Sequence, residues 1–170
     1  MTTACSLRIH ILTISDKASR GERVDGTGPA LGRRLEELGW NVSGIDVVPD
    51  EREQIASELR RLAGRGDVDI VFTAGGTGLA PRDVTPDATS EVVDRIVPGI
   101  GELVRAEGLK HTPRAALSRG TAGTLGKTLI INLPGSPRGA VESVEAIASI
   151  LDHAVEILRG EGSECARPGR

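Results

Sequence analysis

Short apolar runs alternate along the chain with segments whose apolar residues recur at helical spacing. The apolar runs, which are typical of buried strands, lie at 7–15, 41–48, 70–73 and 128–133. The segments with helical spacing lie at 29–38, from Asp50 to Leu62, at 86–96, at 99–107, and from Pro137 to a terminating glycine at Gly160. The alternation predicts an α/β fold with three α/β/α layers, in which a mostly parallel sheet carries helices on both faces.

The chain length of 170 residues suits one domain with a single core. Residues 5–159 are expected to form this domain, with a loop or hairpin between 107 and Gly126. Residues 160–170 are rich in glycine and charge, and we expect them to form a disordered tail.

A glycine cluster directly follows the third apolar run. Ile70–Phe72 predict a buried strand, and Gly75, Gly76, Thr77 and Gly78 come directly after it. Glycines in this place let the backbone turn sharply and point N–H groups at a ligand, which is usually a phosphate. Taken alone, the glycines equally fit a tight turn with no ligand.

Arg82 and Asp83 end this loop, and a helix is predicted to begin just after them. Thr85, Pro86 and Asp87 fit the N-cap, the first helical residue and an acidic residue of the first turn. The loop is therefore expected to be held between two regular elements. A carboxylate fixed beside a bound phosphate indicates a divalent metal.

Candidate ligand-binding residues follow each of the four predicted strands. They are Thr13, Ser15 and Asp16 after the first strand, Asp50 after the second, Gly75 to Asp83 after the third, and Asn132, Pro134, Gly135 and Ser136 after the last. Because ligands of open α/β sheets bind beyond the carboxyl ends of the strands, we expect these four groups to form one site.

Two of these groups also fit ordinary helix starts. Asp50, with Glu53 three residues later, fits an aspartate version of the capping box, and Ser136 followed by Pro137 is a common helix start. A capping residue at a strand-to-helix turn still faces a ligand, and the N-terminus of a helix attracts anions. We therefore favour ligand binding at both positions, with capping as the alternative.

Basic side chains near the predicted site are candidates to pair with phosphates. They are Lys17, Arg82 and Arg119, although Arg82 would equally form an ion pair with a neighbouring acid. The three histidines, at positions 10, 111 and 153, share no metal-ligand spacing.

Bulk composition argues against several classes of protein. The net charge of −3 and an aromatic content of 1% favour neither duplex binding nor base stacking, so no nucleic-acid partner is expected. No strand is followed by G-x-G-x-x-G, which disfavours a dinucleotide-dependent oxidoreductase. The segment 121–128 is similar to a Walker A loop, but it lacks the first glycine and leads into a strand.

The termini predict a cytoplasmic protein without a membrane partner. The first residues carry neither a charged leader nor a small-residue cleavage site, and the run at 7–14 is too short to span a bilayer. Cys5 and Cys165 lie near opposite ends without metal-like spacing, so we expect two reduced thiols without a role.

Longer blocks of the sequence match a known family, in its order. They are Ile14-Ser15-Asp16, Asp25 to Leu31, Val48 to Glu51, Gly75 to Pro86, Leu117-Ser118-Arg119 and Asn132 to Pro137. Together they resemble the molybdenum cofactor biosynthesis proteins of the MoaB/Mog type over roughly residues 7–158. The long string that begins at Gly75 makes the match specific, because GGTG alone is common.

The resemblance implies an adenylyltransferase that moves AMP from ATP to the terminal phosphate of molybdopterin and releases pyrophosphate. Asp50 and Asp83 match the two family aspartates associated with metal-dependent transfer, and they are expected to be catalytic and to hold Mg²⁺. Residues expected to bind the substrates ATP and molybdopterin are Thr13, Ser15, Asp16, Gly75, Gly76, Thr77, Gly78, Arg82, Ser118, Asn132, Pro134, Gly135 and Ser136.

The resemblance also implies a homotrimer and a separate molybdenum-insertion protein that takes the product. One alternative is a homologue that binds molybdopterin or a nucleotide without catalysis. A further alternative, from a different class, is a carrier or scaffold in cofactor assembly. Pyrophosphate release that depends on both ATP and molybdopterin separates the enzyme from these alternatives.

Overall fold

The computed structural model of the chain describes residues 6–160. Its strands are β1 (Arg8–Ile14), β2 (Asn41–Val48), β3 (Ile70–Ala74), β4 (Arg95–Ile96), β5 (Ala122–Leu125) and β6 (Thr128–Leu133). Its helices are α1 (Asp16–Ser19), α2 (Thr27–Glu37), α3 (Arg52–Gly64), α4 (Thr85–Val92), α5 (Pro98–Leu109), the 3₁₀ turn η1 (Pro113–Leu117) and α6 (Pro137–Arg159). Cys5, Cys165 and the predicted tail beyond Gly160 lie outside the described residues.

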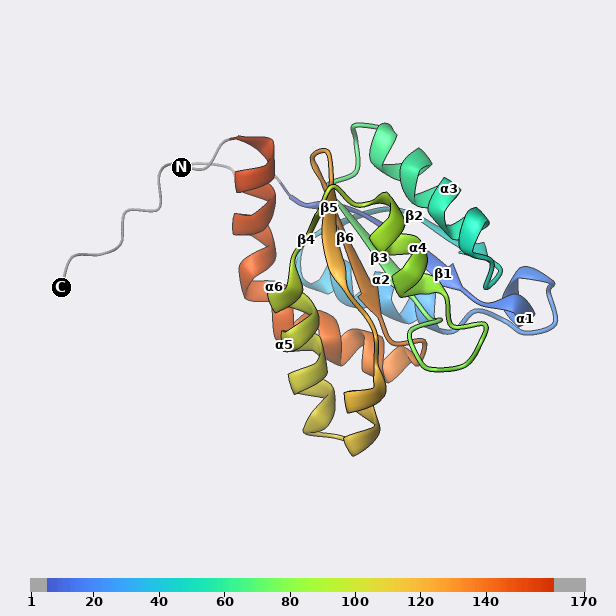
Figure 1. Cartoon of the computed structure of the whole chain (residues 1–170). Helices are drawn as coiled ribbons and strands as arrows, with labels where there is room; N and C mark the ends of the chain where they lie inside the picture. Colours follow the sequence, from blue (N-terminus) through green and yellow to red (C-terminus); the bar gives the residue numbers. More distant parts are fainter. Residues whose placement is uncertain (1–5, 161–170) are drawn as a thin grey trace.

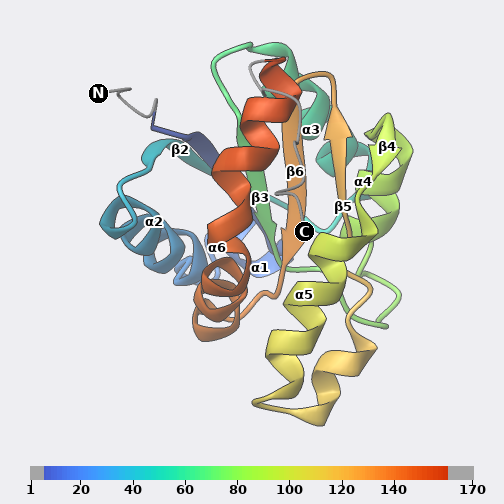
Figure 2. The same cartoon turned by 90° about the vertical axis from the view of Figure 1, so that its left-hand side faces the viewer.

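The strands form one six-stranded sheet in the order β2-β1-β3-β6-β5-β4. The first four strands of this order run parallel, and β5 and β4 are antiparallel additions at one edge. Helices α2, α5 and α6 cover one face of the sheet, and α3 and α4 cover the other (Figures 1 and 2). The predicted three-layer, mostly parallel α/β fold is therefore confirmed.

Each face of the sheet has its own hydrophobic core, rather than the single core that was expected, because successive residues of a strand point to opposite faces. In β1, Ile9 and Ile11 pack with α2 and α6, whereas Leu12 and Ile14 pack with α3 and α4. The central strand β3 is buried over its whole length, as a parallel strand covered on both faces must be.

Most predicted elements are confirmed, and three predicted details are wrong. The predicted helix 86–96 ends at Val92, where Val93 turns to an extended conformation and Arg95–Ile96 join β5 as β4. Val84, rather than Thr85, is the N-cap residue of α4. Likewise the N-cap residue of α3 is Glu51, rather than Asp50.

The similarity of segment 121–128 to a Walker A loop is misleading, as predicted, because the segment forms the β5–β6 hairpin around Gly126. At the start of α6, Ser136 caps the helix by accepting a hydrogen bond from Gly139 N, and Gly160 ends it with a left-handed φ of 80°. Within residues 6–160, no helix combines the length and hydrophobicity that crossing a bilayer requires.

Candidate functional site

The carboxyl ends of the parallel strands meet at one edge of the sheet, where Figure 1 shows α1 and the β3–α4 loop side by side. A cavity of about 580 Å³ opens at this edge. Among the residues that line it are Thr13, Ser15, Asp50, Gly75, Gly76, Gly135 and Ser136. The structure therefore brings together residues from all four predicted groups.

A larger cavity of about 680 Å³ lies beside the first one. It is lined by Thr77, Gly78, Ser118, Pro134 and Ser136 of the predicted set, together with residues of α5, η1 and the start of α6. Five basic or imidazole side chains line its walls, namely Arg105, Lys110, His111, Arg114 and Arg138. The nearby carboxylates Glu107 and Glu142 pair with three of them, Lys110, His111 and Arg138.

The two cavities are neighbours along the glycine loop. Gly75 and Gly76 line the smaller cavity, the next two residues line the larger one, and Ser136 lines both. Two ligands, one in each cavity, would therefore come close to each other at the glycine loop and the N-terminus of α6. This arrangement suits a reaction that joins two substrates.

The glycine loop has a backbone that only glycine adopts without strain. Gly75 and Gly76 have φ angles of 115° and 64°. A Cβ at Gly75 would lie 2.4 Å from the carbonyl oxygen of Ile14, and one at Gly135 would lie 3.2 Å from Gly75 Cα. The absence of side chains here lets the loops after β1, β3 and β6 approach one another.

Asp16 and Asp50 hold each other in place. The Asp50 Oδ2 atom accepts a hydrogen bond from Asp16 N at 2.8 Å, and Asp16 Oδ1 accepts one from Asp50 N at 3.1 Å. These bonds replace the predicted capping box, since Glu51 is the N-cap of α3 and makes no side-chain capping bond. The Asp50 carboxylate therefore lines the smaller cavity instead of capping α3.

The surroundings of Asp50 disfavour its ionised form, first of all because the carboxyl is partly buried. Burial raises the pKa of the Asp50 carboxyl, and the nearby charges of Asp16 and Asp83 act in the same direction. In contrast, hydrogen bonding from Arg82 lowers the pKa of Asp16. A cation bound near Asp50 and Asp83 would relieve the repulsion between these carboxylates.

Arg82 is already paired with acids within the chain. Its Nε and Nη2 atoms donate to the Asp16 carboxylate at 2.7 and 2.9 Å, and Nη2 also donates to Glu51 at 2.8 Å. Hydrogen bonding to Asp16 and Glu51 raises the pKa of Arg82. The ion-pair alternative for Arg82 is therefore the one observed, and its guanidinium lines neither cavity.

Asp83 lies at the end of the glycine loop, partly exposed and outside the lining of both cavities. Its Oδ2 atom accepts a hydrogen bond from Ala80 N at 2.9 Å. Arg119 fastens the same loop, because its guanidinium donates to the carbonyl oxygens of Gly78 and Asp83 and pairs with Asp87. Like that of Arg82, the guanidinium of Arg119 is therefore already bonded to groups within the protein.

Asn132 turns inward, away from both cavities. Its Nδ2 atom donates to Thr73 Oγ1 and Thr89 Oγ1, both at 2.9 Å, while Oδ1 accepts from Thr121 N at 3.2 Å. The side chain is 2% exposed. These bonds link β6 to β3 and α4, so a substrate would need to displace them to reach the amide.

Sequence reasoning missed two charged residues that line the smaller cavity, Arg23 and Asp25. Asp25 accepts hydrogen bonds from Thr27 N, Gly28 N and Thr13 Oγ1. Both amides belong to the first turn of α2, whose N-cap residue is Gly26, and an aspartate just before a helix indicates such bonds. Arg23 donates to Ser15 Oγ at 3.3 Å, and nothing in the local sequence indicated its place.

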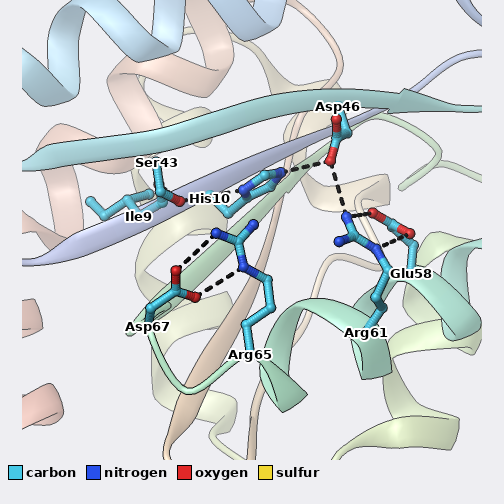
Figure 3. Close-up of polar contacts among 8 residues, drawn as sticks. All are labelled: Ile9, His10, Ser43, Asp46, Glu58, Arg61, Arg65 and Asp67. Atoms are coloured by element: carbon cyan, nitrogen blue, oxygen red, sulfur yellow. Dashed lines mark hydrogen bonds and ion pairs between the residues drawn. The ribbon is translucent and has the colours of Figure 1, made fainter.

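A second polar cluster lies between β1, β2 and α3, away from the strand ends (Figure 3). Buried His10 lies 3.0 Å from Asp46 Oδ2 through Nε2 and 3.4 Å from Ser43 Oγ through Nδ1. The arrangement of Ser43, His10 and Asp46 is similar to the catalytic triad of a serine hydrolase. However, the Ser43 hydroxyl donates to the Ile9 carbonyl at 3.1 Å, and none of the three residues lines either cavity.

The carboxylates at the site fit a metal that arrives with a substrate. No three His, Cys, Asp or Glu side chains between residues 6 and 160 gather closely enough to enclose an ion. Mg²⁺ commonly takes only one or two carboxylates and fills its other positions with phosphate oxygens and water. Asp50 has one carboxylate oxygen, Oδ1, that accepts no hydrogen bond from residues 6–160, and it is available as such a ligand.

The fold and the paired cavities define a three-layer α/β protein with two adjoining cavities at the carboxyl edge of its sheet. A family model described as "Probable molybdopterin binding domain" matches residues 10–153. The chain belongs to this family of molybdenum cofactor biosynthesis proteins, which confirms the resemblance seen in the sequence.

Individual relatives agree with this membership. The chain is 40% identical over 157 residues to the molybdopterin adenylyltransferase of Helicobacter pylori strain J99, covering 91% of this chain and 89% of that protein. It is also 40% identical over 154 residues, 90% of this chain, to the molybdenum cofactor synthesis protein cinnamon of Drosophila melanogaster, of which it spans only 26%.

Solved structures give the same result for the fold. The crystal structure of the molybdopterin biosynthesis enzyme MoaB from Thermus thermophilus matches with a TM-score of 0.85 and 52% identity. The match covers 91% of this chain and 97% of that one.

Proposed function

We propose that this protein is an adenylyltransferase of molybdenum cofactor biosynthesis, which transfers AMP from ATP to the terminal phosphate of molybdopterin. The proposal rests on one structural observation above all, the two adjoining cavities separated by the glycine loop. A transfer between two phosphate-bearing substrates requires such neighbouring sites. The curated relatives named molybdopterin adenylyltransferase support the same reaction.

Molybdopterin is assigned to the larger cavity. The resemblance implies that it binds near Ser118, Asn132 and the turn at 134–136, and of these residues Ser118, Pro134 and Ser136 line that cavity. Basic side chains of η1 and α6, such as Arg114 and Arg138, attract its phosphate. The nucleotide then occupies the smaller cavity, where Gly76 and the N-terminus of α6 offer backbone N–H groups to phosphate oxygens, whereas the Gly75 N–H already donates to the Leu133 carbonyl oxygen at 3.1 Å.

In this arrangement the protein mainly positions its substrates. An oxygen of the molybdopterin phosphate attacks the α-phosphorus of ATP, and the bond from that phosphorus to the bridging oxygen breaks to release pyrophosphate. Holding both phosphates across one glycine loop converts a bimolecular encounter into a reaction within one complex. The fixed N–H groups stabilise the negative charge that develops in transfer.

Asp50 and Asp83 are the proposed ligands of Mg²⁺. The free Oδ1 atom of Asp50 and the mutual repulsion of the nearby carboxylates support this assignment. When bound, the ion neutralises phosphate charge and orients the leaving pyrophosphate. Asp16, which fixes Asp50 through reciprocal backbone bonds, belongs to the same proposed site.

The assay for this function follows pyrophosphate and product mass when the purified protein is incubated with ATP, Mg²⁺ and molybdopterin. We expect equal amounts of pyrophosphate and adenylylated molybdopterin, and neither product without the acceptor. Pyrophosphate release without molybdopterin would indicate a different reaction. Tight binding of both substrates without product would favour the binding or scaffold alternative.

The homotrimer, the cytoplasmic location and the separate molybdenum-insertion partner are part of the same proposal. Light scattering of the full chain tests the first of these, and a monomer at all concentrations would overturn it. Transfer of the adenylylated product to an insertion protein requires that product to leave the larger cavity, which opens to solvent beside α5 and η1.

A further inference from the structure

Thr85 carries a buried hydroxyl group that the fold leaves without a partner. It is 0% exposed in the first turn of α4, and among residues 6–160 its Oγ1 atom has no hydrogen-bond partner. The capping role expected for a threonine in this position is absent, because Val84 is the N-cap and the helix makes no side-chain capping bond. Buried hydroxyl groups nearly always have a partner, so this one requires an explanation.

The orphaned hydroxyl faces the candidate catalytic carboxylate across Gly76. A Cβ on Gly76 would lie 2.4 Å from Thr85 Oγ1 and 3.2 Å from Asp50 Oδ1. Both oxygens therefore lie on the side of Gly76 from which a side chain would project, and the absence of that side chain lets them approach each other. The backbone keeps this geometry, since Thr85 N donates to the Gly76 carbonyl at 3.1 Å.

The two oxygens have complementary chemistry. An ionised carboxylate only accepts hydrogen bonds, whereas a threonine hydroxyl donates one and rotates to suit its acceptor. The other carboxylate oxygen of Asp50, Oδ2, is already held by Asp16 N. A bond to Oδ1 would fix the second oxygen and hence the plane of the carboxylate.

We propose that Thr85 is a positioning residue for Asp50, and that its hydroxyl donates a hydrogen bond to Asp50 Oδ1, directly or through one water. The carboxylate is then held from two sides, by α1 and by α4, with its remaining lone pairs directed at the ligand. What Asp50 does with this orientation rests on the function proposed above. The hydrogen bond between Thr85 and Asp50 does not depend on which reaction the protein catalyses.

The test compares Thr85→Val with Thr85→Ser. Valine keeps the shape of threonine and removes the hydroxyl, and serine keeps the hydroxyl. Thr89 provides a matched control because it is also 0% exposed on α4, but its Oγ1 has a partner in Asn132. Thermal unfolding and the separate values of kcat and KM for adenylylation are measured for all the variants.

A positioning role predicts different results for the two threonines. Thr85→Val should lower kcat at least about tenfold with little change in KM, and its unfolding temperature should change little, because Asp50 lines a cavity in which water can replace the lost donor. Thr85→Ser should restore most of the kcat. Thr89→Val should lower the unfolding temperature, because it breaks an existing bond.

Two results would overturn the proposal. One is full activity in Thr85→Val, which would show that the hydroxyl does not contribute to catalysis. The other is a fall in the unfolding temperature of Thr85→Val that is large enough to account for its lost activity, because Thr85 would then stabilise the fold and not the orientation of Asp50.

A crystal structure of the wild-type protein at high resolution tests the hydrogen bond whatever reaction the protein catalyses. We expect Thr85 Oγ1 within hydrogen-bond distance of Asp50 Oδ1 or of one water that also contacts it. A hydroxyl bound to any other group would refute the proposal. A wild-type protein without adenylyltransferase activity but with this bond would instead refute the proposed function alone.

Discussion

Arg119 shows how a single residue holds the candidate site together. Its guanidinium binds the two ends of the segment 78–83 through the carbonyl oxygens of Gly78 and Asp83, and its backbone N–H donates to Thr77 O at 2.8 Å. An ion pair with Asp87 ties the same guanidinium to α4. The planar fork of an arginine suits these divergent acceptors.

Removing the Arg119 guanidinium should make the loop that carries Asp83 more mobile. We expect Arg119→Leu to lower kcat/KM for adenylylation by about tenfold or more, equivalent to about 1.4 kcal/mol, because Asp83 loses its fixed position. Asp87→Asn is the matched control, since it removes the ion pair and leaves both carbonyl contacts. Equal activity in Arg119→Leu and the wild type would show that the loop needs no fastening.

His10 links the stability of the fold to pH. Burial lowers the pKa of the His10 imidazole below 6.5, although the hydrogen bond to Asp46 acts in the opposite direction, and the charges of Arg61 in α3 and of Arg65 just after it add to the lowering. Figure 3 shows this imidazole between β2 and the side chains of Arg61 and Arg65. The bulge that places it requires Gly44, where a Cβ would lie 2.7 Å from His10 Cε1.

The free energy of unfolding should therefore decrease as the pH falls below about 6.5. In this range the unfolded chain takes up a proton at His10 that the folded chain resists, so stability is present at higher pH and lost toward acid. Urea unfolding between pH 7.5 and 5 measures the slope. His10→Gln, whose amide still bonds to Asp46, should flatten it, and an unchanged slope would remove His10 as the cause.

Among the elements, helix α6 joins the stability of the fold to ligand binding. It spans Pro137–Arg159, its apolar stripe packs on the sheet, and its N-terminus opens between the two cavities. Ser136 caps this terminus through Gly139 N at 3.2 Å. The same residue therefore satisfies the helix and borders both ligands.

Two substitutions at Ser136 should separate these roles. Ser136→Ala should cost about 1 kcal/mol of folding free energy, because it removes the cap. Ser136→Asp should keep the cap and the stability but weaken nucleotide binding, because it places a negative charge where phosphate binds. Thermal unfolding and calorimetric titration measure the two effects, and tight nucleotide binding by Ser136→Asp would contradict the assignment.

The order and type of the main elements could be predicted because the periodicity of the sequence is local and strong. Strand β4 could not, since Arg95–Ile96 are a strand only through pairing with β5, and the apolar spacing around them continues that of a helix. Similarly, Asp50 and Thr85 follow the local rules for caps, but contacts with Asp16 and Gly76 decide where their side chains lie.

The sequence could predict where the candidate site lies, but it could not predict what each of its side chains does there. Gly75, Ser136 and Asp50 lie where the carboxyl ends of parallel strands must meet. Asn132 and Arg82 lie at the same edge, yet hydrogen bonds within the fold occupy both side chains. Whether a side chain already has hydrogen-bond partners within the fold depends on residues far away in the sequence, which no local pattern indicates.

For the molecule as a whole, the antiparallel strands β4 and β5 extend the sheet beyond its parallel part, and α5 and η1 form the outer wall of the larger cavity. The parallel strands and their loops form the smaller cavity. The architecture thus builds two neighbouring sites on one continuous sheet. The central claim is that the carboxylates at this junction serve the transfer of AMP between them.

The most direct test of this claim is the turnover of Asp50→Asn and Asp83→Asn, measured by the mass of adenylylated molybdopterin formed from ATP and Mg²⁺. Asp67→Asn, an exposed acid paired with Arg65 away from both cavities, is the matched control. We predict a loss of at least about a hundredfold for each site variant, with unfolding temperatures close to that of the wild type and normal turnover in the control. Near-normal product formation by the site variants would contradict the account.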